Sequence, residues 1–308
     1  NRKFFIDTDT ASDDAVAILM ALETKDVDVL GVSIVSGNMP VNQGSVNALY
    51  TIEVCKKNTP VYIGADSPMV KKREHADWFH GPDGMGNMNY PMPKIGASKE
   101  NFIEVLKNHI QEYPYEITLV TLGPLTNIAN FIKKDYESFL KLKNIVIMGG
   151  AANTVGNVTP AAEYNIWVDP EAAKIVFNSG LQITMVGWDN SYKYAMLKAK
   201  EVNDLKSINS KYADFCVDIQ KTLTELTYST YGFYGFDLPD PITMAIAIDN
   251  NIIIESQQLH VLVDTRDGIT RGQTIVDYFN AERGIQNVRV VTKSDKDKFI
   301  NLLSQLVQ

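Results

Sequence analysis

The chain has 308 residues and a formal net charge of -8, and its apolar, aromatic and charged fractions are typical of a soluble globular protein. This acidic balance argues against a surface for nucleic acid or anionic membranes, because affinity for phosphate groups comes from clustered Lys and Arg. No apolar stretch approaches the length of a membrane span, so a membrane-spanning protein is not expected. No signal-peptide pattern precedes the first predicted strand, and removal of a leader before residue 1 stays open.

The two cysteines, Cys55 and Cys216, lie far apart in the sequence, each in a helix-like segment. Neither has a Cys or His at metal-ligand spacing. We therefore expect buried free thiols in a reducing compartment, which favours a cytoplasmic location.

Strand-like and helix-like stretches alternate over the first two thirds of the chain. Apolar stretches typical of buried strands cover residues 3–7, 29–36, 61–63, 117–121, 145–148 and 183–186. Apolar residues at helical spacing cover residues 13–23, 41–56, 99–111, 124–133 and 170–178. This βαβ rhythm predicts the α/β class, with a mostly parallel open sheet flanked by helices and a Rossmann-like core.

The last part of the chain has a less regular pattern. Residues 158–169 are loop-like, residues 197–226 look helical, strands are expected at 259–264, 274–278 and 288–291, and a closing helix is expected at 296–307. No internal repeat, low-complexity tract or Pro-rich linker divides the sequence. We expect a single domain over residues 1–308.

Four aspartates lie within eight residues at the end of the first predicted strand: Asp7, Asp9, Asp13 and Asp14. Open α/β sheets bind ligands at the carboxyl ends of their strands. A helix with Ser12 as its N-cap would explain Asp13 and Asp14 through the helix dipole, but it would not explain Asp7 and Asp9. Four like charges in one crevice repel unless a cation or a shared proton compensates, so the segment predicts a metal site.

Small residues and polar groups also follow other predicted strands. They are Ser36-Gly37-Asn38 after the second strand, Thr121-Leu122-Gly123-Pro124 after the fourth and Gly149-Gly150 after the fifth. Together they predict one crevice at the strand ends. No Gly-x-Gly-x-x-Gly follows a strand, and neither a Gly-Lys-Ser/Thr loop nor a Gly-x-Ser-x-Gly elbow occurs, so the sequence supports no dinucleotide site, NTP site or serine-hydrolase elbow.

The segment Asp7-x-Asp9-Thr10 resembles the first motif of the haloacid dehalogenase-like phosphatases, in which the first Asp is the nucleophile and the ion is magnesium. This resemblance covers only a handful of residues. The family also requires a Lys after a later strand and a Gly-Asp acidic motif; no lysine ends a suitable strand, and residues 186–189 approximate the acidic motif badly. A magnesium-dependent phosphatase is therefore the weaker alternative.

A second set of motifs is spread over most of the chain. The pattern Asp-x-Asp-x-x-x-Asp-Asp occupies residues 7–14, and matching stretches follow at 37–38, 47–48, 80–86, 123–129, 148–150, 156–160, 162–165, 169–173, 239–241 and 270–274. In this order the motifs resemble the inosine-uridine-type nucleoside hydrolases. The resemblance implies the nucleoside hydrolase fold.

The resemblance also implies one bound calcium ion. Its ligands would be Asp9, both oxygens of Asp14, the backbone carbonyl of Leu122 and the carboxylate of Asp240. Calcium prefers many oxygen ligands and leaves room for a water and two ribose hydroxyls. The resemblance also implies a set of ribose-binding residues: Asp13, Asn38, Asn157, Glu163, Asn165 and Asp240. Such a dense polar set rejects sugars that lack a hydroxyl, because buried partners would be left unpaired.

The implied reaction is hydrolysis of the N-glycosidic bond of a ribonucleoside to ribose and free base. Asp9 would take the proton of the attacking water, Asp13 would belong to the same catalytic set, and the anionic cage would stabilise an oxocarbenium-like transition state. Many pyrimidine-acting members carry a His directly before the metal-binding Asp, and here that residue is Pro239, which cannot donate a proton. Purine ribosides are therefore slightly favoured as substrates.

Two aromatic segments could stack on the base. Trp78 and Phe79 precede the 80–86 loop, and the segment before Asp240 contains Tyr228, Tyr231, Phe233, Tyr234 and Phe236. Tyr231 and Tyr234 are candidates both for base binding and for the missing proton donor. The alternative for each aromatic residue is ordinary packing, although the cluster with Gly232 and Gly235 is typical of a mobile lid.

Four further residues have expected supporting roles. His80 would either contact the base or support its loop, Arg271 and Asp277 would buttress the fold, and Asp7 would orient the site without binding the ion. A homologue that binds nucleoside or calcium without turnover stays open as an alternative, although the intact set of aspartates argues against it. The family resemblance also suggests a homodimer or homotetramer in nucleoside salvage.

Overall fold

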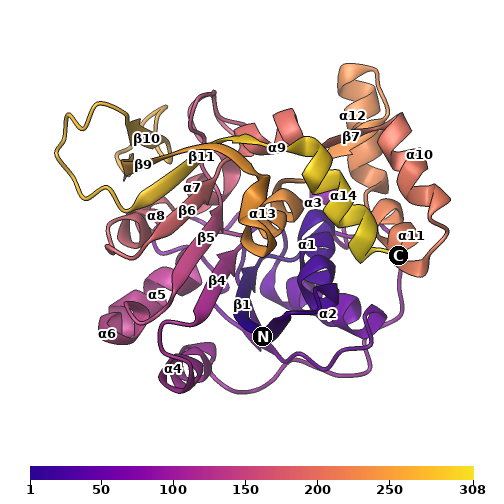
Figure 1. The fold of residues 1–308 in the computed structure, drawn as a ribbon, viewed down its shortest axis with the longest axis horizontal. Coiled ribbons are helices and arrows are strands. Elements are labelled where there is room, and N and C mark those ends of the chain that lie inside the picture. Colours follow the sequence, from indigo (N-terminus) through magenta and orange to yellow (C-terminus); the bar gives the residue numbers. More distant parts are fainter.

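A nine-stranded sheet forms the centre of the computed structural model, which describes residues 1–308 apart from the side chain of Asp77 (Figure 1). In order across the sheet, the strands are β10 (Thr274–Asp277), β9 (Ile253–Val263), β11 (Val288–Ser294), β6 (Ile183–Val186), β5 (Asn144–Met148), β4 (Ile117–Thr121), β1 (Arg2–Thr8), β2 (Val27–Ile34) and β3 (Val61–Ile63). The strands from β11 to β3 run parallel, whereas β9 is antiparallel to both of its neighbours, β11 and β10. The predicted mostly parallel α/β sheet is confirmed.

Helices cover both faces of this sheet. One face packs mainly against α1 (Ser12–Glu23), α2 (Val41–Val54), α11 (Lys211–Asp218), α13 (Pro239–Ile248) and α14 (Lys296–Leu306). The other face packs against α4 (Phe102–Glu112), α5 (Thr126–Lys134) and α8 (Pro170–Phe177). The shorter or peripheral elements are α3 (Asp77–His80), α6 (Tyr136–Phe139), α7 (Tyr164–Val168), α9 (Trp188–Tyr194), α10 (Ala199–Ser207), α12 (Lys221–Tyr231), a 3-10 turn at Asn250–Ile252, and a ribbon of β7 (Met196–Lys198) with β8 (Gly235–Asp237).

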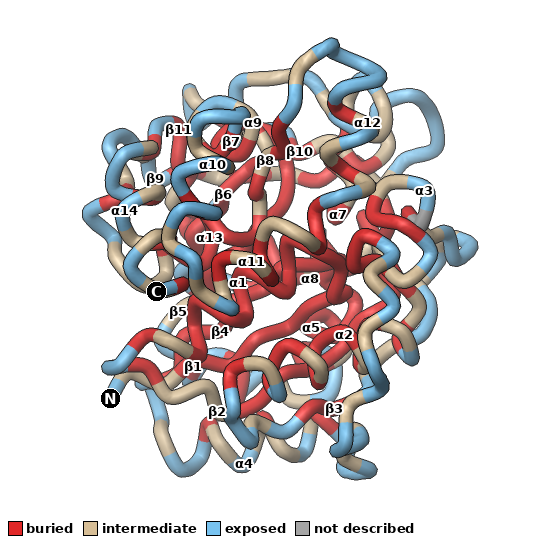
Figure 2. The backbone as a smooth tube through the Cα atoms, turned by 90° about the vertical axis from the view of Figure 1, so that its right-hand side faces the viewer, coloured by how far each residue is buried: buried red, intermediate tan, exposed pale blue. Residues whose placement is uncertain are grey.

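Strand β1 shows how the sequence builds these two layers. Side chains alternate between the faces of a strand. Phe4 and Ile6 enter the core on the α1 side, whereas Phe5 enters the core on the α5 side, and all three are almost fully buried. Figure 2 shows the buried backbone concentrated around β1, β4, β5 and α1. A strand buried on both faces reads as a continuous apolar run, which is why β1 could be predicted.

Most predicted element bounds agree with the structure to within a few residues, and those of β3, β4 and β6 are identical. Both cysteines are buried and free, as expected. Within the described residues, none of the helices has the length and apolar character needed to span a bilayer. The single domain over residues 1–308 stays a prediction.

The predicted N-cap of α1 is wrong. Ala11 occupies the cap position, and the carboxylate of Asp14 accepts the Ala11 backbone N–H at 3.2 Å. Ser12 is already inside the helix, where its hydroxyl lies 2.9 Å from Nδ1 of His80. An acid three residues into the helix caps it from inside, so no cap from Ser12 is needed.

Two other predicted regions also differ from the structure. Residues 158–169 are not entirely loop, because Glu163 caps the short helix α7 through its side chain. Residues 197–226 are not one helical stretch, because β7 occupies the start and α10, α11 and α12 are separated by turns, one of them with Asn209 at a positive φ of 56°. Helix α13 was not predicted, although Pro in its first turn is a typical helix start.

Candidate active site

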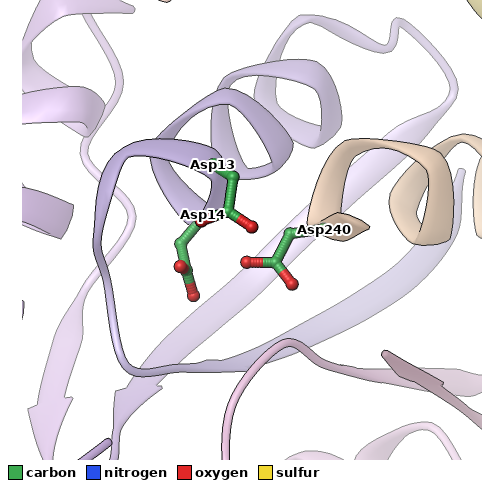
Figure 3. Close-up of side chains that lie close together, drawn as sticks. All are labelled: Asp13, Asp14 and Asp240. Atoms are coloured by element: carbon green, nitrogen blue, oxygen red, sulfur yellow. The ribbon is translucent and has the colours of Figure 1, made fainter. Parts of the chain in front are cut away.

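The acidic residues of the opening motif converge at the carboxyl end of β1, where α1 begins. Asp13 and Asp14 lie in the first turn of α1, and Asp240 lies in the first turn of α13, a helix that packs against α1. All three are buried, and one carboxylate oxygen of each lies within 4.8 Å of the others (Figure 3). Residues 226 positions apart in sequence thus form one acidic cluster.

Asp9 lies beside this cluster, in the turn between β1 and α1. Its Oδ2 accepts the backbone N–H of Asn38 at 2.7 Å. Two glycines make room for it: a Cβ on Gly37 would lie 2.3 Å from Asp9 Oδ2, and one on Gly123 would lie 3.0 Å from Asp9 Cγ. The small residues at the ends of β2 and β4 therefore let the backbone approach this carboxylate.

The cluster carries negative charge that no basic side chain balances. None of the described Lys or Arg side chains forms an ion pair with Asp9, Asp13, Asp14 or Asp240. Burial raises the pKa of Asp9 to about 7 and that of Asp13 to about 6. Burial and then the charge of Asp9 hold the pKa of Asp14 well above its usual range, while burial and then Asp13 and Asp14 do the same for Asp240.

This arrangement fits a hard cation. Asp9 Oδ1 and Asp13 Oδ1 are buried oxygens without a hydrogen-bond partner among the described residues. Asp14 Oδ1 and Oδ2 each accept one hydrogen bond, from Thr8 Oγ1 and from the Ala11 N–H, so each keeps a lone pair. Buried acids with free oxygens and no cationic partner are the donor set that calcium prefers.

Asp7 lies beneath the cluster, inside the sheet. Its Oδ1 accepts hydrogen bonds from Ser33 Oγ at 2.5 Å and from Asn127 Nδ2 at 2.7 Å. Burial raises its pKa to about 7. Asn127 also donates to the Ile34 carbonyl and accepts from the Ala65 N–H, so it ties the ends of β2 and β3 to β1. These contacts agree with the expected supporting role of Asp7.

The predicted residues Leu122, Glu163 and Asn165 lie together at the ends of β4 and β5. Asn165 Nδ2 donates to the carbonyls of Leu122 and Met148, each at 3.1 Å. Glu163 accepts the N–H groups of Gly150 at 2.9 Å and Asn165 at 2.8 Å, and burial raises its pKa to about 7. The end of β5 and the start of α7 therefore fix both side chains.

Asn38 and Asn157 lie on loops at the same end of the sheet. Asn38 is partly buried, and its backbone, not its side chain, makes the contact with Asp9. Asn157 is exposed, and its Oδ1 accepts the Tyr164 N–H at 3.0 Å. This bond uses the Asn157 oxygen, so the group that remains for a ligand is the Nδ2 amide.

Three of the predicted aromatic residues are exposed, whereas Phe236 is buried in the core. The exposed fractions of Trp78, Tyr231 and Tyr234 are 68%, 73% and 58%. Tyr234 stacks on Tyr228 with ring centroids 4.3 Å apart. Trp78 lines a pocket of about 400 Å³ between the 81–87 turn and the start of α12, but Tyr231 and Tyr234 are not among its lining residues. This pocket therefore includes Trp78 but neither of the two tyrosines.

His80 has a buried position next to the acidic cluster. Its Nδ1 lies 2.9 Å from the hydroxyl of Ser12, and its ring packs edge-on against Phe79. Burial lowers the pKa of His80, and the charge of Asp13 opposes this effect. These contacts favour the loop-support interpretation of His80.

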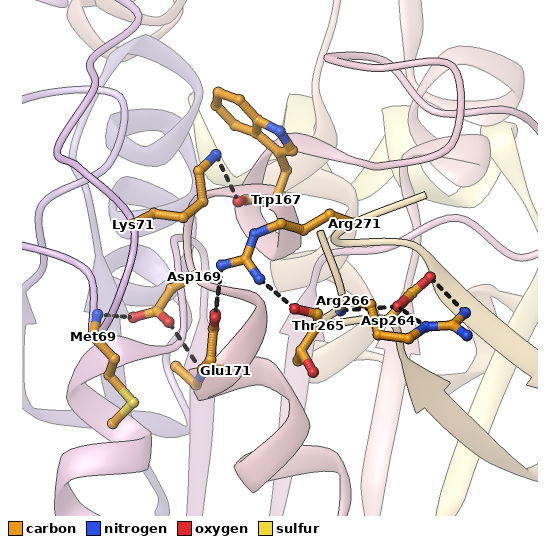
Figure 4. Close-up of polar contacts among 10 residues, drawn as sticks. Met69, Lys71, Trp167, Asp169, Glu171, Asp264, Thr265, Arg266 and Arg271 are labelled. Atoms are coloured by element: carbon orange, nitrogen blue, oxygen red, sulfur yellow. Dashed lines mark hydrogen bonds and ion pairs between the residues drawn. The ribbon is translucent and has the colours of Figure 1, made fainter. Parts of the chain in front are cut away.

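A separate polar network contacts α7 and α8 (Figure 4). Arg271 donates to both carboxylate oxygens of Glu171, at 2.6 and 3.0 Å, and also to the Thr265 carbonyl. Lys71 Nζ lies 3.0 Å from the ring centroid of Trp167. Asp277 accepts N–H groups from the following turn. Arg271 and Asp277 therefore contact the scaffold, as expected.

Sequence reasoning assigned no role to several polar residues that organise the site. Besides Ser33 and Asn127, Asn47 of α2 donates to the carbonyls of Thr10 and Asp83, so it joins the β1–α1 turn to the 80–86 loop. The sequence feature that could have identified them is a polar residue on a strand or helix that is otherwise apolar and buried. Such residues need a partner when buried.

The chain is similar to known proteins over nearly its whole length. The family model for inosine-uridine preferring nucleoside hydrolases matches residues 4–301. Uridine nucleosidase 1 of Arabidopsis thaliana is 37% identical over 279 residues, which cover 90% of this chain and 82% of that protein. The pyrimidine-specific ribonucleoside hydrolase RihA of Salmonella arizonae is 33% identical over 308 residues, which cover 97% of this chain and 96% of that protein.

Solved structures give the same result. The plant nucleoside hydrolase PpNRh1 has a TM-score of 0.93 at 33% identity, covering 99% of this chain and 98% of that chain. The purine-preferring ribonucleoside hydrolase from Gardnerella vaginalis has a TM-score of 0.90 at 29% identity, covering 99% of each chain. With the family model matching nearly the whole length, the chain belongs to the inosine-uridine preferring nucleoside hydrolases and is an enzyme of the ribonucleoside hydrolase type.

Proposed function

We propose that this enzyme hydrolyses the N-glycosidic bond of ribonucleosides in a calcium-dependent reaction, with purine ribosides slightly favoured. The observation that carries the proposal is the buried acidic cluster of Asp9, Asp13, Asp14 and Asp240, which has free oxygens and no cationic partner among the described residues. Because the chain belongs to the nucleoside hydrolase family, we do not pursue the phosphatase alternative.

Four groups would hold the calcium ion: Asp9, Asp14, Asp240 and the carbonyl of Leu122. The Leu122 oxygen already accepts one hydrogen bond from Asn165, and its second lone pair is left for the ion. When bound, calcium supplies a positive charge that orients a water and makes it more acidic.

The side chains would then divide the chemistry among them. Asp9 would accept the proton of the attacking water, because it is a buried carboxylate with one free oxygen. As the water bonds to C1′, the bond to the base breaks and its electron pair leaves with the base. Asp13, acting with Asp9, would stabilise the positive charge that develops on the ribose.

Six residues would recognise the ribose: Asp13, Asn38, Asn157, Glu163, Asn165 and Asp240. Most of them are buried or held by backbone contacts before any substrate arrives. A preorganised polar set of this kind discriminates strongly against a sugar that lacks one hydroxyl. We therefore expect ribonucleosides to be preferred over 2′-deoxyribonucleosides.

The base preference is the finer part of the proposal. Related proteins differ in this respect, since RihA is named pyrimidine-specific and the Gardnerella enzyme purine-preferring. Pro239 begins α13 directly before Asp240 and has no proton to donate. A purine could instead gain basicity by stacking on Trp78. His80 is a further candidate for contact with the base, and Tyr231 and Tyr234 are candidates for contact with the base or for proton donation.

Release of free base from inosine, adenosine, guanosine, uridine and cytidine tests this function. We expect turnover of the ribonucleosides, fastest with purines, and a loss of at least about 1,000-fold in Asp9→Ala. Release from none of them by the wild type would favour the alternative of a nucleoside-binding or calcium-binding homologue.

Two further properties are proposed with this function. A homodimer or homotetramer is expected, which sedimentation of the purified protein would test. A cytoplasmic location is also expected and could be tested by cell fractionation. The ribonucleoside remains the proposed partner, and neither nucleic acid nor membrane is expected to bind this acidic protein.

A further inference from the structure

The loop between β5 and α7 is held along its whole first half by other elements. Each residue from 150 to 155 makes a hydrogen bond either to α9 or to β10 and the residue that follows it. The partners are Trp188 N–H for the Gly150 carbonyl, Thr274 for Ala151, Asp189 for Ala152, Tyr278 for Asn153, Tyr192 for Thr154 and the Trp188 indole for Val155. We call residues 150–157 the ribose loop, because Asn157 lies at its end.

Helix α9 supplies most of this clamp. Trp188 binds both ends of the clamped segment: its backbone N–H donates to the Gly150 carbonyl at 3.0 Å, and its indole Nε1 donates to the Val155 carbonyl at 2.8 Å. The Trp188 ring packs on Tyr192 with centroids 4.5 Å apart, and the Tyr192 hydroxyl lies 2.9 Å from Thr154 Oγ1.

The approach of α9 to the loop depends on a glycine. A Cβ on Gly187 would lie 2.3 Å from Asp189 Oδ1 and 2.9 Å from the Gly150 carbonyl oxygen. The stretch Val186-Gly187-Trp188-Asp189, which has no place in the proposed chemistry, thus has a role in holding the ribose loop.

Strand β10 holds the loop from the other side. The Thr274 hydroxyl accepts the Ala151 N–H at 2.9 Å and donates to the Ala151 carbonyl at 2.8 Å, and the Tyr278 hydroxyl after β10 donates to Asn153 Oδ1 at 2.6 Å. The side chain of Val155 is 65% exposed. At this end of the loop, apolar burial contributes little, so order comes from hydrogen bonds.

The loop in turn holds two of the proposed ribose-binding residues. The Gly150 N–H donates to Glu163 Oε1 at 2.9 Å, and the backbone N–H of Asn157 donates to the Ala162 carbonyl at 3.0 Å. Asn157 thus follows the clamped segment by two residues, and movement at the start of the loop would release one of the bonds that orient Glu163.

We propose that Trp188 is a positioning residue. Together with Tyr192 it holds the ribose loop in its binding conformation before substrate arrives, so that Asn157 contacts the ribose without a loss of loop entropy on binding. The proposal rests on the proposed function. A preset contact strengthens substrate binding because less conformational freedom is lost on association.

Two conservative variants test the clamp while keeping an aromatic ring at each position. Trp188→Phe deletes the indole N–H, and Tyr192→Phe deletes the hydroxyl. Tyr136→Phe is the matched control, because it deletes a tyrosine hydroxyl that donates to the Ser179 carbonyl on another part of the fold. Hydrogen exchange of residues 150–157 should accelerate about tenfold in both clamp variants and stay at the wild-type rate in the control.

Kinetics then separate positioning from general stability. Trp188→Phe should raise KM for a ribonucleoside about fivefold to tenfold with little change in kcat, whereas Tyr136→Phe should change neither. In the Asn157→Ala background, the further increase caused by Trp188→Phe should fall to less than about twofold, because the residue that it positions is gone.

Two results would overturn the inference: wild-type exchange of the ribose loop in both clamp variants, or a KM effect of Trp188→Phe that persists in full without Asn157. Hydrogen exchange is measured without substrate. It therefore shows whether Trp188 and Tyr192 hold the loop, even if the wild-type protein releases no base. Absence of base release from the wild type would count against the proposed function alone.

Discussion

Single residues decide how closely backbone and ligand groups can approach the acidic cluster. Gly37 and Gly123 lie against Asp9, and their hydrogen atoms occupy the place where any other residue would carry a Cβ. These glycines could be identified from the sequence as small residues after strands. That both of them contact the same carboxylate could not, because the contact depends on the order of β1, β2 and β4 in the sheet.

We predict that Gly37→Ala reduces turnover by at least about 100-fold, since the new methyl group would displace the Asp9 carboxylate by a large fraction of an ångström or more. Gly96→Ala is the matched control, because a Cβ there meets no atom within 4 Å. Steady-state kinetics of both variants would measure the effect. Equal activity in the two variants would show that Asp9 does not need its observed position.

At the scale of elements, the short helix α7 presents two of the proposed ribose-binding residues, Asn165 and its cap Glu163. Helix α7 has only five residues and depends on the Glu163 side chain, which accepts the Asn165 and Ile166 N–H groups. A helix of this length has no reliable periodicity in the sequence, which explains why the segment looks like a loop. The long, apolar or amphipathic elements were predictable because their patterns are local, whereas α7 is stabilised by its cap and by packing.

We predict that Glu163→Ala lowers the free energy of unfolding by about 1–2 kcal/mol, because the cap of α7 is lost, and that it also raises KM for ribonucleosides. Glu163→Gln should retain more stability, since one oxygen remains to accept hydrogen bonds, but it should also raise KM. Denaturant unfolding and kinetics measure the two effects separately.

The control for this prediction is Asp295→Ala, which removes the side-chain cap of α14 away from the acidic cluster. It should cost similar stability and leave KM unchanged. An increase of KM in Asp295→Ala as large as in Glu163→Ala would mean that lost stability alone explains the kinetic effect.

For the whole molecule, buried acids link folding to pH and to the metal. Burial raises the folded-state pKa of Asp7, Asp9 and Glu163 to about 7 and that of Asp13 to about 6, all above their ordinary values. A raised folded-state pKa favours the protonated form, so the associated stability is complete below pH 4 and is lost as pH rises through 6 to 7. Calcium would bind the ionised form and offset this loss.

We predict that, in the presence of a chelator, Tm falls as pH is raised from 5 to 8. Added calcium should raise Tm by several degrees at pH 8 and by much less at pH 5. Thermal unfolding followed by circular dichroism measures both trends. A chelated protein whose Tm is constant over this range, or a calcium effect that is larger at pH 5, would contradict the assignment of the acids.

The sequence was sufficient for the α/β class, for the acidic motif at the end of β1 and for the distant partner Asp240, the last through family resemblance. The supporting contacts were not predictable, because they join residues that are far apart in the chain. Asn127 lies 120 positions from Asp7, and Thr274 lies 123 positions from Ala151. Neither pair carries a local pattern, and each becomes visible only when the sheet order is known.

The proposed function requires that the acidic cluster hold calcium during hydrolysis of a ribonucleoside. Its most direct test is the rate of base release from inosine by chelated, dialysed enzyme before and after addition of calcium, with magnesium as the comparison ion. We predict a rate reduced at least about 100-fold without metal, and restored by micromolar to millimolar calcium but not by magnesium. A full rate in the metal-free enzyme would contradict the claim.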